Sequence, residues 1–303
     1  MNAKLGYADK VIVNTLLENH SGSEPNFLAQ HGVSFLIEVT VDNITKRILF
    51  DTGQSAEAVI HNMKNLDINP GTIDMIALSH CHYDHTGGLV GMLKEIHKQD
   101  IPILAHPSLF DIHLVAGTGP KPRNWLTRPL GMIGENTEEN IRLHGGFPTL
   151  ISNPFELMPG VLWAGEIDRV TDFEKKPTLV PRIIKNGEVV EDAIIDDTAL
   201  AINIKGNGLY VVSGCSHSGI VNIVKQCIRF SQVEKIKAVV GGFHLMNANV
   251  DRIEKTIKAL KELNVEKVYS GHCTGFKALA TIYREFGDNF EELYSGKIIR
   301  SNL

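Results

Sequence analysis

The chain has 303 residues, 43% of them hydrophobic and 21% charged, so it is long enough to bury a substantial core in one large or two small domains. Its formal net charge of −5 gives no electrostatic reason to expect nucleic acid as a partner. No uninterrupted apolar stretch approaches about 18 residues, which argues against a membrane span.

The first third of the chain alternates short strand patterns with helical ones. β-branched and apolar runs predict the strands, and apolar residues three to four positions apart predict the helices. The expected strands are 11–13, 33–41, 47–50, 75–79 and 101–104, and the expected helices are 55–66 and 87–97. From about 107 to 160 the pattern becomes irregular. Long loops in compact domains usually carry functional residues or cover a binding site, so we expect this segment to be an insert that covers the site.

Regular patterning resumes at Val161. The expected strands are 161–166, 198–204, 208–213, 236–240 and 266–270, and the expected helices are 217–230, 249–263 and 276–286. No linker or repeat forces a boundary, so we expect one domain over 1–303. A sheet whose strands are apolar on both faces must pack against another layer of structure on each side. The pattern therefore predicts an α/β fold with two mixed sheets face to face and helices outside, a four-layer αββα sandwich.

Four potential metal ligands lie within six residues after the apolar segment that ends near Leu78. They are His80, His82, Asp84 and His85. On a strand, His80 and His82 would point the same way and hold one cation, and a turn would let Asp84 and His85 face a second. Imidazole with carboxylate suits zinc, iron or manganese better than calcium. The alternative is a group of unrelated polar residues in a surface loop.

This HxHxDH run resembles the signature of the metallo-β-lactamase superfamily. Phe50-Asp51-Thr52-Gly53 and Val268-Tyr269-Ser270-Gly271-His272 are similar to two further motifs of that superfamily. Four more segments look like one branch, which includes archaeal enzymes similar to dihydropterin–ribofuranosylaminobenzene phosphate synthases. They are SGCSHSGIVNIV (213–224), VVGGFHL (239–245), SGHCTG (270–275) and PGVLWAGEIDR (159–169).

The resemblance assigns roles to several of these residues. It implies that His272 is a late metal ligand and that Asp51 supports the ligands from behind, where it would fix the tautomer of an imidazole. Asp51 could instead serve as a turn or N-cap residue. Asp84 is the candidate catalytic residue, because a carboxylate beside the cations can take a proton.

The chain departs from the superfamily pattern at two places. Most members of the superfamily have a further histidine, in a third motif, about halfway between the first histidine cluster and a bridging aspartate. It has no clear match here, since none of His97, His106, His113 and His144 has the usual Pro-Gly-His setting. Where a bridging aspartate is usual, this chain has Cys215, with His217 two residues further on. We expect His217 to be the ligand and Cys215 to lie behind it. Cys215 remains the alternative ligand, because a thiolate binds zinc or iron well.

Other residues are candidates for substrate contact. His244 follows paired glycines at a strand end, and the branch resemblance points to Glu166 and Arg169; structural roles are the alternative for all three. In the irregular insert, Trp125 lies among three cations that could hold a phosphate beside a stacked pterin-like ring, or be solvated loop charge. These cations are Lys121, Arg123 and Arg128.

The cysteines and the first residues bear on the compartment. Four cysteines do not make a disulfide framework, and three lie inside the histidine-rich motifs, where free thiols suit a reducing environment. Residues 1–10 lack the basic-then-apolar build of a signal peptide. We therefore expect a cytoplasmic protein with a small-molecule partner, and the sequence leaves a homo-oligomer open.

These observations favour a metal-dependent enzyme acting on a phosphate- or diphosphate-bearing small molecule, and the branch resemblance implies a dihydropterin transferase-like synthase. One or two divalent ions are expected, zinc first, with iron, manganese, magnesium or nickel as alternatives. The alternatives in function are a metal-dependent hydrolase of a phosphodiester, lactone or thioester and an iron-binding redox or sensor protein.

Overall fold

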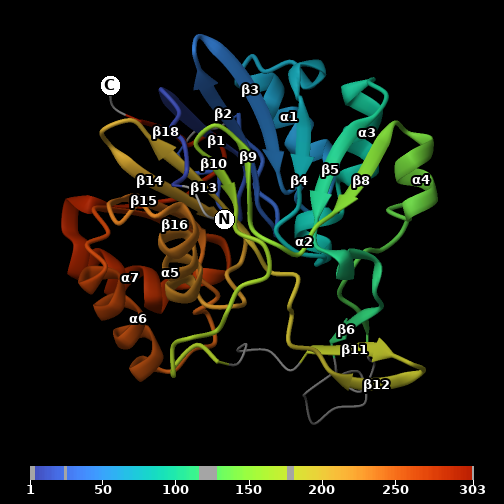
Figure 1. The fold of residues 1–303 in the computed structure, drawn as a ribbon. Helices are drawn as coiled ribbons and strands as arrows, with labels where there is room; N and C mark the ends of the chain where they lie inside the picture. Colours follow the sequence, from blue (N-terminus) through green and yellow to red (C-terminus); the bar gives the residue numbers. More distant parts are fainter. Residues whose placement is uncertain (1–3, 24–25, 116–127, 176–180, 302–303) are drawn as a thin grey trace.

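The computed structural model describes residues 4–23, 26–115, 128–175 and 181–301. Two seven-stranded sheets form its centre (Figure 1). Within the described ranges no helix combines the length and the apolar character that crossing a bilayer requires.

The first sheet is mixed. Its strand order is β18-β1-β2-β3-β4-β5-β8, antiparallel from β18 to β3 and parallel from β3 to β8. The bounds are β18 Ile298–Arg300, β1 Lys10–Leu17, β2 Ser34–Val41, β3 Ile44–Phe50, β4 Met75–Ala77, β5 Ile101–Ala105 and β8 Gly146–Leu150.

The second sheet is also mixed. Its order is β17-β16-β15-β14-β13-β10-β9, parallel from β17 to β14 and antiparallel from β14 to β9. The bounds are β17 Phe290–Glu292, β16 Lys267–Gly271, β15 Ile236–Gly242, β14 Gly208–Ser213, β13 Ala199–Ile204, β10 Val161–Trp163 and β9 Phe155–Met158.

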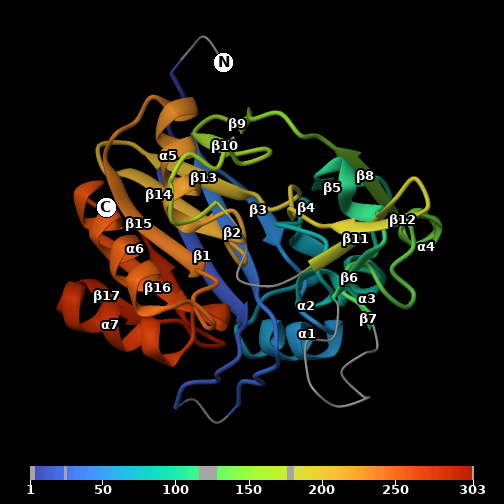
Figure 2. The ribbon, with the colours of Figure 1, turned by 90° about the horizontal axis from the view of Figure 1, so that it is seen from below.

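Three apolar clusters hold four layers together, as the sequence predicted. The central cluster lies between the sheets and includes the fully buried Phe35, Phe50 and Trp163. Burying each such side chain contributes roughly 2–3 kcal/mol. A second cluster joins the first sheet to α1 (Ala56–Asn65) and α3 (Leu89–Ile96). The third joins the other sheet to α5, α6 and α7, so helices cover both outer faces (Figure 2). These helices span Ile220–Ser231, Val250–Glu262 and Phe276–Phe286.

Part of the segment expected to be irregular is regular. Between 107 and 160, β8 and β9 are members of the two large sheets, and α4 (Glu138–Leu143) packs against β8. Because these elements are short and are separated by proline and glycine, the sequence shows no clear strand or helix periodicity there. Lys121, Arg123 and Trp125 lie outside the described residues, and Arg128 is described only as the start of β7 (Arg128–Pro129).

A third, four-stranded sheet was not predicted. Its order is β12-β11-β6-β7, with β12 Glu188–Glu191, β11 Pro181–Lys185 and β6 His113–Val115. It lies beside the edge of the sandwich (Figure 1). The hairpin β11–β12 turns at Asn186-Gly187, where both residues have positive φ (53° and 81°). Asn-Gly is the strongest short-range hairpin signal, so the sequence did contain the information.

Two expected elements are shorter than predicted, the strand at its end and the helix at its start. The strand expected at 75–79 stops at Ala77, so His80 and His82 lie in the following loop rather than on a strand. The helix expected from residue 217 begins at Ile220, because Ser216 (φ 60°) and Gly219 (φ 92°) hold the preceding turn out of helical conformation. Both differences place potential ligands in turns.

Candidate metal centre

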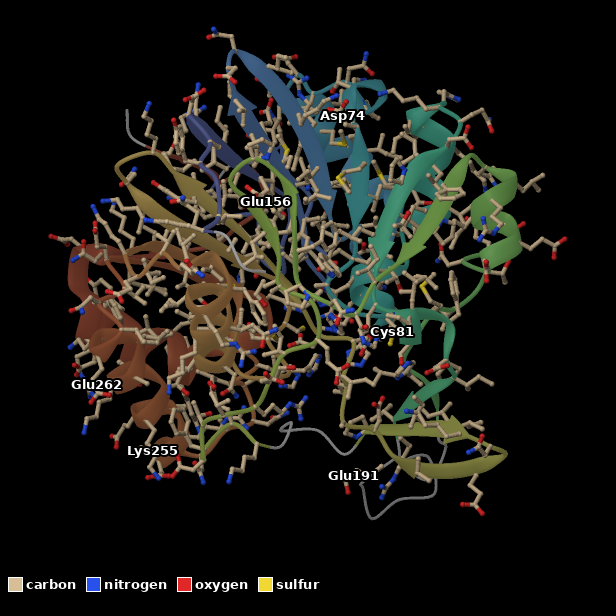
Figure 3. All side chains as sticks on the ribbon, viewed as in Figure 1. Asp74, Cys81, Glu156, Glu191, Lys255 and Glu262 are labelled. Atoms are coloured by element: carbon tan, nitrogen blue, oxygen red, sulfur yellow. The ribbon has the colours of Figure 1, made fainter. Side chains whose placement is uncertain are left out.

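Five strand ends gather the motif residues at one edge of the sandwich. Parallel strands of one sheet end at the same edge, so the segments that follow β3 and β4 lie together, as do those that follow β14, β15 and β16. The short helix α2 (Tyr83–Thr86) presents the end of the HxHxDH run. Cys81 marks this region, where the two halves of the sandwich meet (Figure 3).

His80, His82 and His217 form a first group of potential ligands. Their ring centroids lie 4.4 Å (80–82), 4.7 Å (80–217) and 4.7 Å (82–217) apart. All three side chains are buried, and among the described residues Nε2 of His80, Nε2 of His82 and both ring nitrogens of His217 have no hydrogen-bond partner. Buried polar atoms are rarely left without a partner. Converging imidazole nitrogens of this kind fit a divalent cation.

The protonation of this group is suited to metal binding. Burial lowers the pKa of His82 to about 4, and burial with the neighbouring histidines holds the pKa values of His80 and His217 well below the usual range. The three rings are therefore neutral at physiological pH. Neutral imidazole is the form that binds metals.

Asp84, His85, Cys215 and His272 form a second group. The Cys215 Sγ lies 3.1 Å from His85 Nε2 and 3.3 Å from His272 Nε2. Asp84 Oδ2 is 3.6 Å and 3.4 Å from the same two nitrogens. The donors are thus two nitrogens, one oxygen and one sulfur, a set that suits zinc or iron. His217 and Cys215, considered as alternatives from the sequence, fall into different groups.

Three polar side chains orient these ligands. Asp51 is fully buried, and one of its oxygens lies 2.7 Å from His85 Nδ1 and accepts a hydrogen bond from Ser79 Oγ at 2.7 Å. Ser79 Oγ is also 2.9 Å from His80 Nδ1. The Asn19 Oδ1 is 3.0 Å from His272 Nδ1. When a carboxylate or amide oxygen accepts a hydrogen bond from Nδ1 of a histidine, the lone pair of Nε2 is free to face a cation.

The second group carries charge when no cation is bound. Burial opposes the charged forms, but the negative charge on the Cys273 sulfur and the Asp84 carboxylate raise the pKa of His272 to about 9, and Asp84 with Asp51 raises the pKa of His85. These imidazoles in turn hold the pKa of Asp84 well below its usual range, against the effect of burial. Burial raises the pKa of Cys215. A cation binding here would therefore release protons.

A pocket of about 170 Å³ opens onto both groups. Side chains from both halves line it: His31, His82, Tyr83, Asp84, Leu130, Cys215, His217, His244, Met246, Asn247 and Cys273. His244 is almost fully buried, and its ring centroid lies 4.2 Å from that of His217. It therefore lines the pocket next to the first group of ligands.

Two sequence candidates have other partners. Glu166 Oε2 lies 3.5 Å from Nε2 of the buried His106, and neither lines the pocket. The Arg169 guanidinium donates to the backbone carbonyls of Lys175, Ala193 and Ile194. These contacts tie two loops together and use much of its donor capacity. The geometry thus favours a structural role for Arg169.

The remaining third-motif candidates are not placed as ligands of either group. His97 is exposed at the end of α3, and His144 Nδ1 bonds the carbonyl of Asn140 in α4. His113 is buried near Cys81 and Asp196, which makes a third set of ligand-type atoms. However, its Nδ1 lies 2.6 Å from Asp192 Oδ2 and its Nε2 lies 3.1 Å from the Ser108 carbonyl.

Both ring nitrogens of His113 therefore donate. Although burial opposes the charge, the carboxylates of Asp192 and Asp196 raise the pKa of His113 to about 9. The ring is an imidazolium at neutral pH and cannot also bind a metal. Its ion pair with Asp192 instead links strand β6 of the third sheet to the loop after β12, near the HxHxDH run.

Sequence reasoning missed several residues around the pocket. His31 Nε2 lies 3.3 Å from Asp84 Oδ2, and Asn19 and Ser79 contact ligand rings. His31 and Asn19 come from the loop after β1, more than fifty residues from Asp84, and no local pattern marks them. Ser79 directly precedes the motif and could have been included for that reason.

Comparisons with known proteins agree with this architecture. A family model described as a β-lactamase superfamily domain matches residues 46–129. The chain is 47% identical, over 99% of its length and all of the relative's, to a 7,8-dihydropterin-6-methyl-4-(β-D-ribofuranosyl)-aminobenzene-5′-phosphate synthase of Methanocaldococcus jannaschii. A solved metal-dependent hydrolase of the β-lactamase superfamily is 28% identical with a TM-score of 0.78, over 95% of this chain and 98% of that one. A solved diphosphatase is similar in fold alone, at 11% identity and a TM-score of 0.51 over 96% and 97% of the chains.

Proposed function

Because the chain belongs to the β-lactamase superfamily, and within it to the family of the 47% identical synthase, we propose that it is a metal-dependent transferase that joins two aromatic substrates. The proposed donor is a dihydropterin with a diphosphate on its 6-methylene carbon. The proposed acceptor is 4-(β-D-ribofuranosyl)aminobenzene 5′-phosphate. The bond from the methylene carbon to the diphosphate oxygen breaks, a bond from that carbon to the amine nitrogen of the acceptor forms, and that nitrogen loses a proton.

The observation that carries the proposal is the pair of ligand groups that opens onto one pocket. His80, His82 and His217 would hold one divalent ion, and Asp84, His85, Cys215 and His272 would hold a second, with zinc the first expectation. When bound, such ions supply positive charge that stabilises a departing diphosphate.

Asp84 has a second capacity in this scheme. Its carboxylate lines the pocket and stays anionic, because the imidazoles around it hold its pKa low. An oxygen that faces the pocket can accept the proton that the acceptor releases. His244 also lines the pocket, and we propose that it contacts the substrate.

The test is release of diphosphate by the metal-loaded protein, measured with each substrate alone and with both. The proposal predicts release only when donor and acceptor are both present. His82→Ala should abolish it. His97→Asn is a matched control, because His97 is exposed, lies outside the site and has a left-handed backbone (φ 52°) that asparagine tolerates.

A metal-dependent hydrolase is the second candidate, favoured by the likeness to the solved hydrolase at 28% identity. It predicts release of diphosphate, or cleavage of a simple phosphodiester, without any acceptor. If the metal-loaded chain cleaves its donor at the same rate with and without the aminobenzene compound, the transferase proposal is wrong.

A further inference from the structure

The pocket above the ligand groups is too small for the whole donor. Its volume of about 170 Å³ is below the roughly 300–1,000 Å³ that encloses a drug-sized ligand. A diphosphate would be held at the floor of the pocket by the divalent ions that the two ligand groups would bind. The methylene carbon joins the diphosphate directly to the pterin, so the ring must lie at the mouth of the pocket.

One side of that mouth is apolar and exposed. Met246 lines the pocket with 53% of its surface exposed, and Phe276, the first residue of α7, is 85% exposed. Their backbones come close together: the Met246 amide donates to the Cys273 carbonyl at 3.1 Å, and a Cβ on Gly275, the residue before Phe276, would lie 2.7 Å from Met246 Cα. We call Met246 and Phe276 the apolar rim.

Two aromatic rings also line this pocket. Tyr83 is half-buried and lines the same pocket, and the His31 ring lies 6.2 Å from the Tyr83 ring and 5.3 Å from the His272 ring, measured between centroids. Single exposed apolar side chains are common on protein surfaces and need no explanation. Here, however, Met246 lines the same pocket as Tyr83 and His31, and Phe276 directly follows the glycine that packs against Met246.

We propose that the apolar rim binds the pterin ring of the donor, with Phe276 stacked on the ring face and Met246 against its edge. This inference rests on the proposed function, because it takes the position of the diphosphate from it. Phe276 is a positioning residue, since it holds the ring while the bond changes occur at the floor of the pocket. An apolar rim at this place would select substrates that carry a planar aromatic group next to the leaving group.

The effect should appear in binding of the aromatic group alone. Removing an aromatic side chain that stacks on a heterocyclic base weakens binding by about tenfold or more. Phe276→Ala should therefore weaken binding of free pterin to the metal-loaded protein about tenfold, measured by pterin fluorescence, with unchanged affinity for inorganic diphosphate. Phe276→Tyr should restore pterin binding, because it keeps the ring. In turnover, Phe276→Ala should raise KM and leave kcat close to wild type.

Tyr283→Ala is the matched control. Tyr283 lies on the same helix seven residues further on, is 62% exposed and packs its ring 6.4 Å from that of Phe290. It should bind pterin as the wild type does. Because Phe276 is so exposed, its loss should not prevent folding, and circular dichroism will verify this.

The outcomes separate this inference from the proposed function. If Phe276→Ala and Met246→Ala both bind pterin as tightly as the wild type, the apolar rim is not the pterin site, whatever the turnover. If the wild type binds pterin through the rim but never releases diphosphate from the donor with the acceptor present, the transferase proposal fails and the rim assignment stands.

Discussion

Replacing Asp51 with asparagine tests how the second ligand group is organised. Asp51 is fully buried and accepts hydrogen bonds from the Ser79 amide and Ser79 Oγ and from His85 Nδ1, all at 2.7 Å. Asparagine keeps the shape and tolerates the left-handed backbone at this residue (φ 61°). It turns one acceptor oxygen into a donor, however, so a donor will face either His85 Nδ1 or the Ser79 amide.

The expected cost follows from that conflict. Losing one hydrogen bond to a charged, buried group should lower the free energy of unfolding by about 1.5–3 kcal/mol. His85 can relieve the conflict by moving its proton to Nε2, but Nε2 is the nitrogen that faces the other ligands. Zinc affinity should therefore fall by about 10- to 100-fold, as for other residues that orient metal ligands.

The assays are urea unfolding of the metal-free protein and competition for zinc with a chromophoric chelator. Asp74→Asn is the matched control, because the Asp74 carboxylate bonds the amide of Arg47 and Lys46 Nζ and lies well away from Cys81 (Figure 3). It should change zinc affinity less than twofold. Zinc affinity in Asp51→Asn within twofold of wild type would refute the reasoning.

Two further predictions concern the surroundings of the site. The folded-state pKa of His113 is about 9 against an ordinary 6.5, so its charge stabilises the fold fully below pH 6.5, by at most about 3 kcal/mol, and this contribution is lost as pH rises to 9. The wild-type advantage over His113→Gln in urea unfolding should thus shrink across that window; a constant difference would show that His113 is not charged. In Gly214→Ala, the added Cβ would lie 2.1 Å from Ser79 Oγ and 2.7 Å from Asp51 Oδ2, so stability should fall by about 1–3 kcal/mol with weaker zinc binding. Gly134→Ala, whose Cβ would meet nothing within 4 Å, should lose stability through its left-handed backbone (φ 64°) but bind zinc normally, and equal losses of zinc affinity in both variants would contradict the packing argument.

Much of the fold could be predicted because its elements are strongly periodic. Helices α6 and α7 and strands β13 and β14 lie within a residue of the predicted bounds. The three-residue edge strands β17 and β18 carry no period of their own, and pairing with β16 and β1 defines them. Tertiary contacts, and not local sequence, decide such elements.

The candidate site divides in the same way. The sequence marked His80, His82, Asp84 and His85 by their spacing, and a strand-ending glycine marked His272. It could not show that Cys215 and His217 lie in different groups, because Ser216 has a left-handed backbone (φ 60°) that depends on its hydrogen bonds to Ser213 Oγ and the Gly242 carbonyl. The sequence also could not show that Arg169 donates to three backbone carbonyls, because two of these acceptors come from a segment distant in the chain.

The zinc content of the chain tests the central claim most directly. After reconstitution with zinc and gel filtration, elemental analysis should find about two zinc ions per wild-type chain, one for each ligand group, and about one in His217→Ala. A wild-type chain without bound zinc, or a His217→Ala variant that retains the full content, would contradict the claim that these buried imidazoles converge to hold cations.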